Sequence, residues 1–264
     1  MEWSSNMSYR RGSRTGKLVM VDGLDGSGKG VIVDGLRKWA EEKRLKVFDL
    51  REHCKKHMDL PEIDDLQGYD VILSAEPTYS HMGRVIREEL IKNSDDRKYS
   101  GLITAHAFSL DRKILYKKVI IPALKKGMHV FQERGVVTSL VYQPMQMEKL
   151  TIGEILSLPG NKFTLEHAPD MLIITMVSPE ETMSRLAQRT GKRDDAIFEK
   201  LEFQNKVKDR YTSDWLRDLF QKHGSKVVYF DTSSPKTPKD TQQESMQLFE
   251  NFLKDDEAEE ILLN

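Results

Sequence analysis

Short apolar runs alternate along the chain with longer stretches in which apolar residues recur every three to four positions. The short runs predict buried β-strands, and the longer stretches predict amphipathic helices that pack on a sheet. We expect strands at residues 18–22, 46–50, 71–75, 128–132, 171–177 and 226–231. We expect helices at residues 30–43, 81–92, 101–125, 179–189, 196–222 and 240–254. This alternation predicts an α/β fold with three layers, in which helices cover both faces of a mostly parallel central sheet.

The same pattern indicates one domain with short appendages. The 264 residues fit one large α/β domain, which we place at residues 17–254. Residues 1–16 contain basic side chains and no apolar segment, and we expect them to form a mobile basic arm. The polar residues 52–69 are predicted to be a loop-like insertion, and residues 255–264 an acidic, solvated tail.

Composition and charge narrow the choice of partners. The formal net charge of −1 gives no overall attraction to nucleic acid or to an anionic membrane, so neither is expected as a partner. No apolar run approaches the roughly 18 residues that a membrane-spanning helix needs. Cys54 is the only cysteine, which excludes a disulfide within this sequence and indicates a reducing compartment, so a cytoplasmic location is expected.

A glycine-rich segment lies between the first predicted strand and the first predicted helix. It reads Gly23-Leu24-Asp25-Gly26-Ser27-Gly28-Lys29-Gly30. In this context such a segment is typical of a phosphate-binding loop, because its amides and the helix N-terminus attract an anion and the lysine reaches the β- and γ-phosphates. We therefore predict nucleotide binding by Gly23, Asp25, Gly26, Ser27, Gly28, Lys29, Gly30 and Val31.

The loop lacks one of its usual parts, the hydroxyl that binds Mg²⁺. A serine or threonine ordinarily follows the lysine, but here Gly30 and Val31 follow it. Asp25 in the loop and Glu133 at the end of a predicted strand are the candidate carboxylate ligands for Mg²⁺. The neighbouring Arg134 offers a planar fork for a phosphate, although Glu133 and Arg134 alone fit an ordinary surface ion pair equally well.

Several short motifs along the chain share the order and spacing of one enzyme family. The motifs are the loop at 23–29, Glu76-Pro77 with Gly83 and Ile86-Arg87, Phe108 with Arg112, Glu133-Arg134 with Ser139 and Tyr142-Gln143, Pro169-Asp170, and Arg185, Arg189 and Arg193. On these motifs the chain resembles the thymidylate kinases over most of residues 17–254. The resemblance implies a P-loop kinase fold and phosphoryl transfer from ATP, with Mg²⁺, to a nucleoside monophosphate, with dTMP as the expected acceptor. It also implies a homodimer.

The resemblance assigns roles to individual residues. Phe108 would lie against the nucleobase, and Arg112 and Arg134 would hold the acceptor nucleotide, Arg134 at its phosphate. The remaining acceptor-binding residues would be Glu76, Ser139, Tyr142 and Gln143. A lid at about residues 185–198 would close over the donor phosphates. The catalytic residues would then be Lys29, Asp25, Arg134, Arg185, Arg189 and Arg193.

Departures from the family pattern keep other functions open. Gly28-Lys29-Gly30 is similar to the loop of polyphosphate-dependent nucleotide kinases, which use carboxylates for magnesium. Glu133-Arg134 is also similar to the signature of deoxynucleoside kinases, whose hydroxyl acceptor requires a carboxylate base. A third alternative is a nucleotide-binding protein that lost its metal hydroxyl and does not catalyse transfer.

Overall fold

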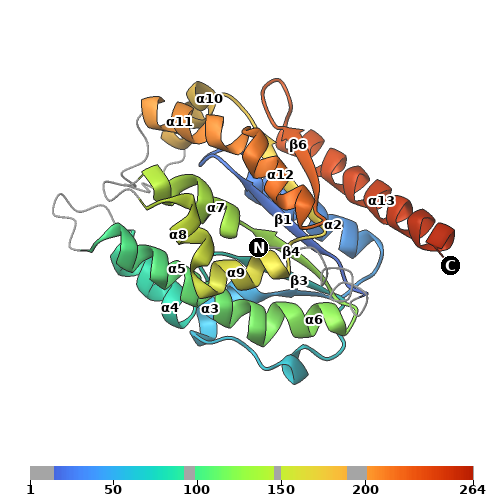
Figure 1. The fold of residues 1–264 in the computed structure, drawn as a ribbon. Helices are drawn as coiled ribbons and strands as arrows, with labels where there is room; N and C mark the ends of the chain where they lie inside the picture. Colours follow the sequence, from blue (N-terminus) through green and yellow to red (C-terminus); the bar gives the residue numbers. More distant parts are fainter. Residues whose placement is uncertain (1–14, 92–98, 146–149, 189–200, 264) are drawn as a thin grey trace.

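The computed structural model describes residues 15–91, 99–145, 150–188 and 201–263 (Figure 1). Residues 1–14 of the predicted basic arm lie outside these ranges. The greater part of the predicted lid also lies outside them, including Arg189 and Arg193. The predictions for these residues therefore stay predictions.

A sheet of six parallel strands forms the centre of the molecule, in the order β2-β3-β4-β1-β5-β6 (Figure 1). Every predicted strand is confirmed to within one residue at each end. Parallel strands are buried on both faces, which explains their nearly continuous apolar sequences. The strands are β1 Leu18–Gly23, β2 Val47–Asp49, β3 Val71–Ala75, β4 His129–Glu133, β5 Met171–Met176 and β6 Lys226–Asp231.

Helices surround this sheet in the part of the chain that the structure describes. None of them is both long enough and apolar enough to cross a membrane. The α-helices are α2 Lys29–Glu42, α3 Leu50–His57, α4 His81–Val85, α5 Gly101–Leu115, α6 Ile121–Lys125, α7 Val136–Tyr142, α8 Ile152–Ser157, α9 Pro159–Glu166, α10 Pro179–Ala187, α11 Leu201–Tyr211, α12 Asp214–Lys222 and α13 Pro238–Leu263. Single turns of other helix types are η1 Ile63–Leu66, η2 Ile86–Leu90, η3 Tyr116–Ile120 and η4 Gln143–Met145.

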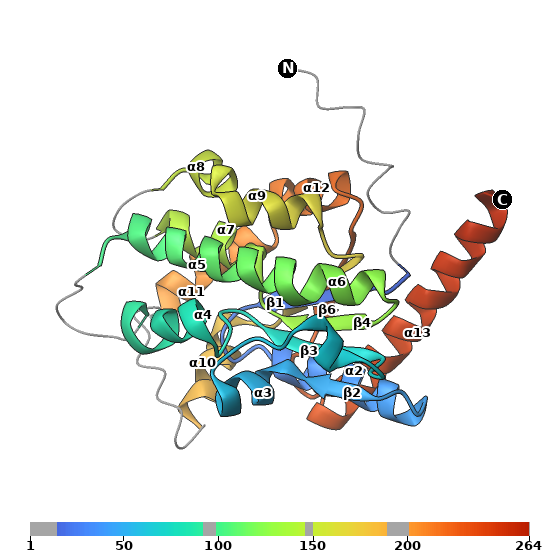
Figure 2. The same ribbon diagram turned by 90° about the horizontal axis from the view of Figure 1, so that it is seen from below.

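The helices cover both faces of the sheet, as predicted (Figure 2). On one face, Val19 and Val21 of β1 share a core cluster with residues of α2 and α13, including Phe249. On the other face, Met20 packs with residues of α7, α11 and α12, and Leu18 packs with residues of α5, η3 and α6. Because side chains alternate along a strand, β1 contributes to every cluster and has no exposed residue.

Two segments that were predicted to be peripheral are anchored to the domain. The prediction of a loop at residues 52–69 is wrong, because α3 and η1 fall there and bury Cys54 and Leu66. The Asp49 side chain caps α3 by accepting from the amide of Arg51 at 3.0 Å. Gly16, at the end of the predicted mobile arm, is buried, and its amide donates to the carbonyl of Leu124 at 3.1 Å.

Helix boundaries differ from the predictions at the C-terminal side of the chain. The single helix expected at 196–222 is two helices, α11 and α12, which are separated at Thr212 and Ser213. The helix expected to end at residue 254 continues as α13 to Leu263, through most of the predicted acidic tail. The helices α7, α8 and α9 were not predicted, although they contribute much of the region described next.

The strand order places three functional segments side by side, at the carboxyl ends of the neighbouring strands β3, β4 and β1. Ala75 of β3 and Val21 of β1 both lie opposite Glu133 of β4, so these strands end side by side. The amide of Glu76 donates to the Glu133 carbonyl at 3.0 Å, and the amide of Arg134 donates to the Val21 carbonyl at 2.8 Å. In open parallel sheets the carboxyl ends of the strands form the ligand crevice.

Candidate active site

The segment from Gly23 to Gly28 forms a tight loop between β1 and α2, as the sequence predicts. Gly26 and Gly28 have φ angles of 80° and 91°, which L side chains rarely adopt. A Cβ on Gly23 would lie 2.0 Å from Thr175 Oγ1, and one on Gly26 would lie 2.7 Å from the Thr182 carbonyl. The loop conformation therefore requires glycine, and it leads directly into the N-terminus of α2.

Lys29 is folded over the loop. Its side chain is buried, and Nζ donates to the carbonyls of Gly23 at 3.1 Å and Leu24 at 2.6 Å. The ammonium also lies 3.9 Å from Oδ1 of Asp25. A cation is thus held at the position where the loop would receive phosphate oxygens.

Asp25 and Arg134 come together from separate segments of the chain. Asp25 accepts a hydrogen bond from Nη2 of Arg134, and the two form an ion pair at the mouth of the loop. Arg134 has a φ of 64°, a left-handed conformation that directs the chain away from β4 immediately after Glu133. The two predicted catalytic residues, Asp25 and Arg134, are therefore adjacent.

Tyr142 lies beside Arg134. Burial raises the pKa of Tyr142 to about 12, although the positive charge of Arg134 opposes that shift, so the phenol stays protonated.

Asp22 is a buried carboxylate below the loop that the sequence analysis missed. Its oxygens accept from the Gly23 amide at 2.8 Å, the Thr138 hydroxyl at 2.9 Å and the Tyr211 hydroxyl at 2.8 Å. These bonds connect the loop to α7 and to α11. The only signal in the sequence is the position of Asp22 at the end of a strand that leads into the loop.

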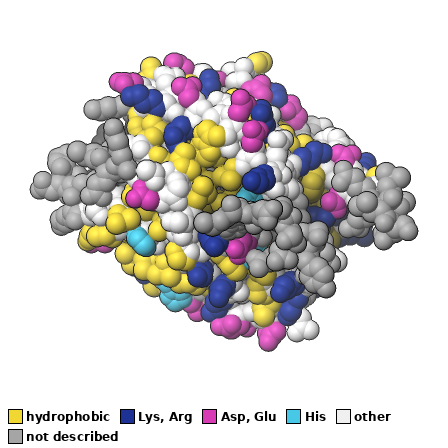
Figure 3. All heavy atoms as spheres, in the orientation of Figure 1, with side chains coloured by type: hydrophobic (Ala, Val, Ile, Leu, Met, Phe, Trp, Pro, Cys, Tyr) yellow, Lys and Arg dark blue, Asp and Glu magenta, His cyan; other side chains and the backbone are white. Residues whose placement is uncertain are grey.

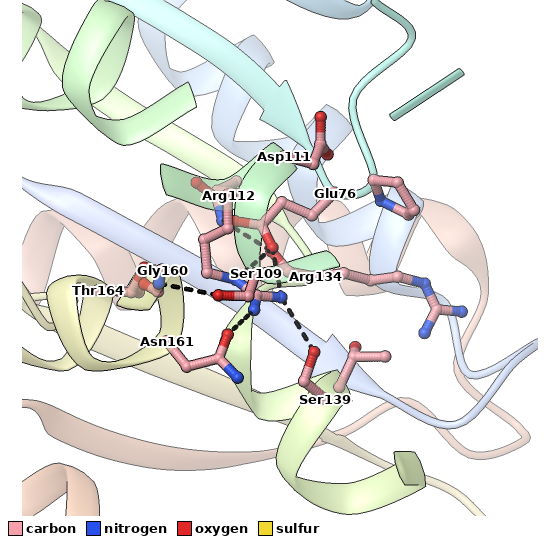
Figure 4. A network of polar contacts seen from close by, with 12 residues as sticks. Glu76, Ser109, Asp111, Arg112, Arg134, Ser139, Gly160, Asn161 and Thr164 are labelled. Atoms are coloured by element: carbon pink, nitrogen blue, oxygen red, sulfur yellow. Dashed lines mark hydrogen bonds and ion pairs between the residues drawn. The ribbon is translucent and has the colours of Figure 1, made fainter. Parts of the chain in front are cut away.

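A second group of polar side chains lies next to the end of β3 (Figure 4). We call it the Arg112 network, and its members are Glu76, Arg112, Gln132, Ser139 and Asn161. Nε of Arg112 donates to Glu76 Oε2 at 2.7 Å, Nη2 donates to Ser139 Oγ at 3.2 Å, and Nη1 donates to Asn161 Oδ1. Gln132 Nε2 donates to the other Glu76 oxygen at 3.0 Å. Burial raises the pKa of Glu76 to about 7, although the positive charge of Arg112 opposes that shift.

The predicted acceptor-binding residues are only partly joined by this network. Glu76, Arg112 and Ser139 belong to it, and Gln143 donates to Ser139 Oγ at 3.2 Å. Tyr142 is nearly buried within the core cluster around Met20. Phe108 is half-buried on α5 and belongs to none of the core clusters identified among the described residues. Its ring is therefore partly exposed and lies outside those clusters, and its stacking role stays a prediction.

The carboxylates near the loop fit Mg²⁺ with a small number of protein ligands. A Cβ on residue 30 would lie 3.7 Å from Glu133 Oε2, so this carboxylate lies beside the position where a hydroxyl side chain would project. Within the described ranges no group of three or more His, Cys, Asp or Glu side chains is arranged to hold a metal. Mg²⁺ commonly takes one or two carboxylates and completes its shell with water and phosphate oxygens, which Glu133 and Asp25 suit.

Arg185 contacts the residue that follows β6, and this residue in turn lies against the glycine loop. Its Nη2 donates to the Thr232 carbonyl at 2.6 Å and to Glu181 Oε1 at 2.7 Å. Thr232, which the sequence analysis missed, donates its hydroxyl to the Ser27 carbonyl at 2.7 Å. Arg185 is therefore connected to the loop through Thr232, and its catalytic role stays a prediction.

Comparisons with known proteins agree with this geometry. The thymidylate kinase family model matches residues 58–237, a range that contains the Arg112 network and Arg134 but not the glycine loop. A probable thymidylate kinase of Pyrococcus abyssi is 32% identical over 209 residues, which cover 78% of this chain and 85% of the relative. A thymidylate kinase of Caldicellulosiruptor saccharolyticus is 30% identical over 192 residues, covering 73% of this chain and 79% of the relative. One of Legionella pneumophila is 26% identical over 250 residues, covering 91% and 97%. This chain belongs to the thymidylate kinase family.

Proposed function

We propose that the protein transfers the γ-phosphate of ATP to dTMP and so forms dTDP and ADP. The observation that carries this proposal is the placement of the glycine loop and the Asp25–Arg134 pair at the same sheet edge as the Arg112 network. The glycine loop suits a triphosphate, and the Arg112 network suits a second nucleotide. Membership of the thymidylate kinase family supports both assignments.

The reaction requires positioning and charge neutralisation more than covalent chemistry. An oxygen of the acceptor phosphate attacks the γ-phosphorus, and the bond from that phosphorus to the bridging oxygen of ADP breaks. Because the acceptor is already a phosphate, no general base is needed. The loop amides bind the donor phosphates, Lys29 neutralises charge on the transferred group, and Arg134 holds the acceptor phosphate in line.

Glu133 and Asp25 are the residues that we propose hold Mg²⁺ or its water ligands. When bound, Mg²⁺ neutralises charge on the donor phosphates and helps to orient them. Glu133 would compensate for the hydroxyl that Gly30 lacks, since its carboxylate lies beside that position. Arg185, Arg189 and Arg193 are proposed to close over the donor phosphates and exclude water.

The acceptor nucleoside is proposed to lie between α5 and α7. The partly exposed ring of Phe108 would stack on the thymine ring, because flat apolar rings pack well against nucleobases. Ser139, Tyr142 and Gln143 would approach the base and sugar from α7 and η4. Glu76 and Arg112 would complete this side of the pocket.

The alternative reactions are not favoured by the relatives, which are named thymidylate kinases. A deoxynucleoside kinase would need a carboxylate base for its hydroxyl acceptor, and the thymidine arm of the assay below tests for it. A polyphosphate donor and a non-catalytic role are separated from the proposed reaction by direct assay.

Nucleotide-dependent product formation tests the proposal. We would incubate the purified protein with ATP, Mg²⁺ and, separately, dTMP, dUMP, dCMP, dAMP, dGMP or thymidine, and then measure ADP and the phosphorylated product. Rapid formation of dTDP is expected. Transfer only to thymidine, transfer only when polyphosphate replaces ATP, or ATP binding without any transfer would each contradict the proposed function.

We also propose that the protein acts as a homodimer in the cytoplasm and without nucleic acid. The outer face of α5 exposes Leu102, Ile103, Leu110 and Ile114, each at 36–53% of its surface, and hydrophobic side chains gather over α5 in Figure 3. Light scattering after gel filtration should give twice the mass of the chain, and Leu110→Lys should give the monomer mass. A wild-type monomer at assay concentration would contradict the dimer.

A further inference from the structure

The close crossing of α9 and α5 depends on Gly160. The Gly160 amide donates to Ser109 Oγ at 2.8 Å (Figure 4). A Cβ on Gly160 would lie only 1.7 Å from the Ser109 carbonyl oxygen. Only a glycine lets the two helix backbones approach this closely. The crossing therefore fixes where the next residue of α9, Asn161, can reach.

Asn161 is fully buried, and both ends of its amide group have partners. Nδ2 donates to the carbonyl of Ile155 at 2.8 Å, which orients Oδ1 toward Arg112. Oδ1 then accepts from Nη1 of Arg112. A buried side-chain amide in this arrangement holds its partner firmly, because rotation would leave both groups unpaired in a place that water does not reach.

The guanidinium of Arg112 is held from three elements. Glu76 follows β3 and takes Nε, Ser139 on α7 takes Nη2, and Asn161 on α9 takes Nη1. Since the guanidinium is planar, acceptors at both of its ends fix the orientation of the plane. Asn161 is the acceptor at the Nη1 end, whereas Glu76 and Ser139 act at the other side.

We infer that Asn161 is a positioning residue for the acceptor nucleotide, and that it acts through Arg112. It holds the guanidinium in the plane in which Arg112 bonds Glu76 and Ser139, two residues that we propose border the acceptor nucleotide. This inference rests on the proposed function, since the acceptor nucleotide is part of that proposal. The sequence gives no sign of this role, because Asn161 lies 49 positions from Arg112.

Substitutions at Asn161 with a control on the same helix test the inference. Asn161→Ala removes Oδ1, and we expect the KM for dTMP to rise about 10-fold or more while the KM for ATP stays within about twofold. Asn161→Leu removes the same acceptor but keeps the volume, so it serves if the alanine variant does not fold. Asn161→Asp keeps an acceptor oxygen for Arg112 but loses the donor to the Ile155 carbonyl, so it should return the KM for dTMP part of the way toward wild type.

Thr164→Val is the matched control, because Thr164 is equally buried on α9 and donates to the Gly160 carbonyl at 3.0 Å, away from Arg112. It should lower thermal stability and leave both KM values unchanged. Equal increases in both KM values for Asn161→Ala or Asn161→Leu, or the same dTMP effect in Thr164→Val, would overturn the inference. So would an aspartate variant as impaired as the leucine variant.

Calorimetric binding of dTMP separates this inference from the proposed function. A wild-type protein that binds dTMP without phosphorylating it would contradict the function, while weaker dTMP binding by Asn161→Leu would still support the role of Asn161. Active wild-type enzyme with unchanged dTMP binding in Asn161→Leu would contradict the inference alone. Wild-type protein that neither binds nor phosphorylates dTMP would overturn both.

Discussion

The glycine loop is built from consecutive residues, whereas the Arg112 network draws its members from five separate elements. Residues 23–30 take their shape from local backbone conformation and from glycines at positions without space for a side chain. The Arg112 network joins residues at the end of β3, on β4, and on α5, α7 and α9. The loop presents backbone groups to a ligand, and the network presents side chains whose positions depend on the whole fold.

This difference predicts different consequences of mutation. Backbone atoms form the anion site of the loop, so the loss of the Lys29 side chain leaves that backbone arrangement in place. A change in the network leaves a buried charge or donor without its partner, which costs stability as well as function. Measurements that separate turnover from stability therefore distinguish the two regions.

The largest expected effect is on turnover at the loop. Lys29→Ala should reduce kcat by about 10²- to 10³-fold, because the ammonium neutralises charge that develops on the transferred phosphate. The midpoint of thermal unfolding should change little. Lys38→Ala, at an exposed position on the same helix where Nζ bonds to Gln242, is the control and should keep wild-type turnover. Near-normal turnover in Lys29→Ala would remove the loop from the mechanism.

The next effect concerns the network and depends on pH. The pKa of Glu76 is raised from 4.5 to about 7, so between these values the folded protein binds a proton that the unfolded chain releases. The contribution of Glu76 to the free energy of unfolding should therefore fall by roughly 3 kcal/mol as pH rises from about 4.5 to about 7, and stay level above that. Urea titrations at several pH values measure the slope, which should be much smaller in Glu76→Gln, where the shifted pKa values of Asp111 and His129 still contribute.

Glu154→Gln is the control for this slope. The pKa of the exposed Glu154 is lowered by hydrogen bonds from Thr151, so its contribution is lost only as pH falls below about 4.5. The decline between pH 4.5 and 7 should therefore persist in Glu154→Gln. If Glu76→Gln keeps the wild-type slope, Glu76 is not the group that titrates.

The same contrast explains what could be predicted from sequence. The strands and the loop were predicted because their signals are contiguous: buried parallel strands read as apolar runs, and the glycines fall at fixed offsets. The fold class followed from their alternation with helices. The helix α3 was missed because its sequence is polar and only Leu50 and Cys54, one turn apart, face the core.

The rest of the site required tertiary information. The resemblance supplied Glu76, Arg112 and Ser139 as acceptor residues, but nothing in the sequence indicated that they share hydrogen bonds. Asn161 and Asp22 were missed because the partners that tie them to the site, Arg112 and Thr138, are more than 40 positions away. The extension of α13 past residue 254 had a local signal, since Glu and Ala are good helix formers, but the acidic composition was interpreted as a tail.

A smaller effect is expected at Glu133, the proposed metal ligand beside the loop. Glu133→Gln removes a charge next to Gly30 and should lower turnover about 10- to 100-fold while raising the Mg²⁺ concentration needed for half-maximal activity. Adding Gly30→Ser to this variant should restore part of the activity, because a serine hydroxyl there would approach the same position. Asp34→Asn, at an exposed position on α2, is the control. An unchanged Mg²⁺ titration in Glu133→Gln would exclude Glu133 as a ligand.

The smallest expected effect concerns Phe108, which lies on the same helix as Arg112 but outside the Arg112 network. Phe108→Ala should raise the KM for dTMP about 10-fold through lost stacking and leave the KM for ATP and the unfolding midpoint close to wild type. Phe163→Ala is the control. Phe163 lies on α9, and its half-buried ring packs against the ring of His167. It should lower stability without a preference between substrates. Equal weakening of both substrates by Phe108→Ala would mean that its ring supports the fold, and the acceptor side would then consist of polar groups alone.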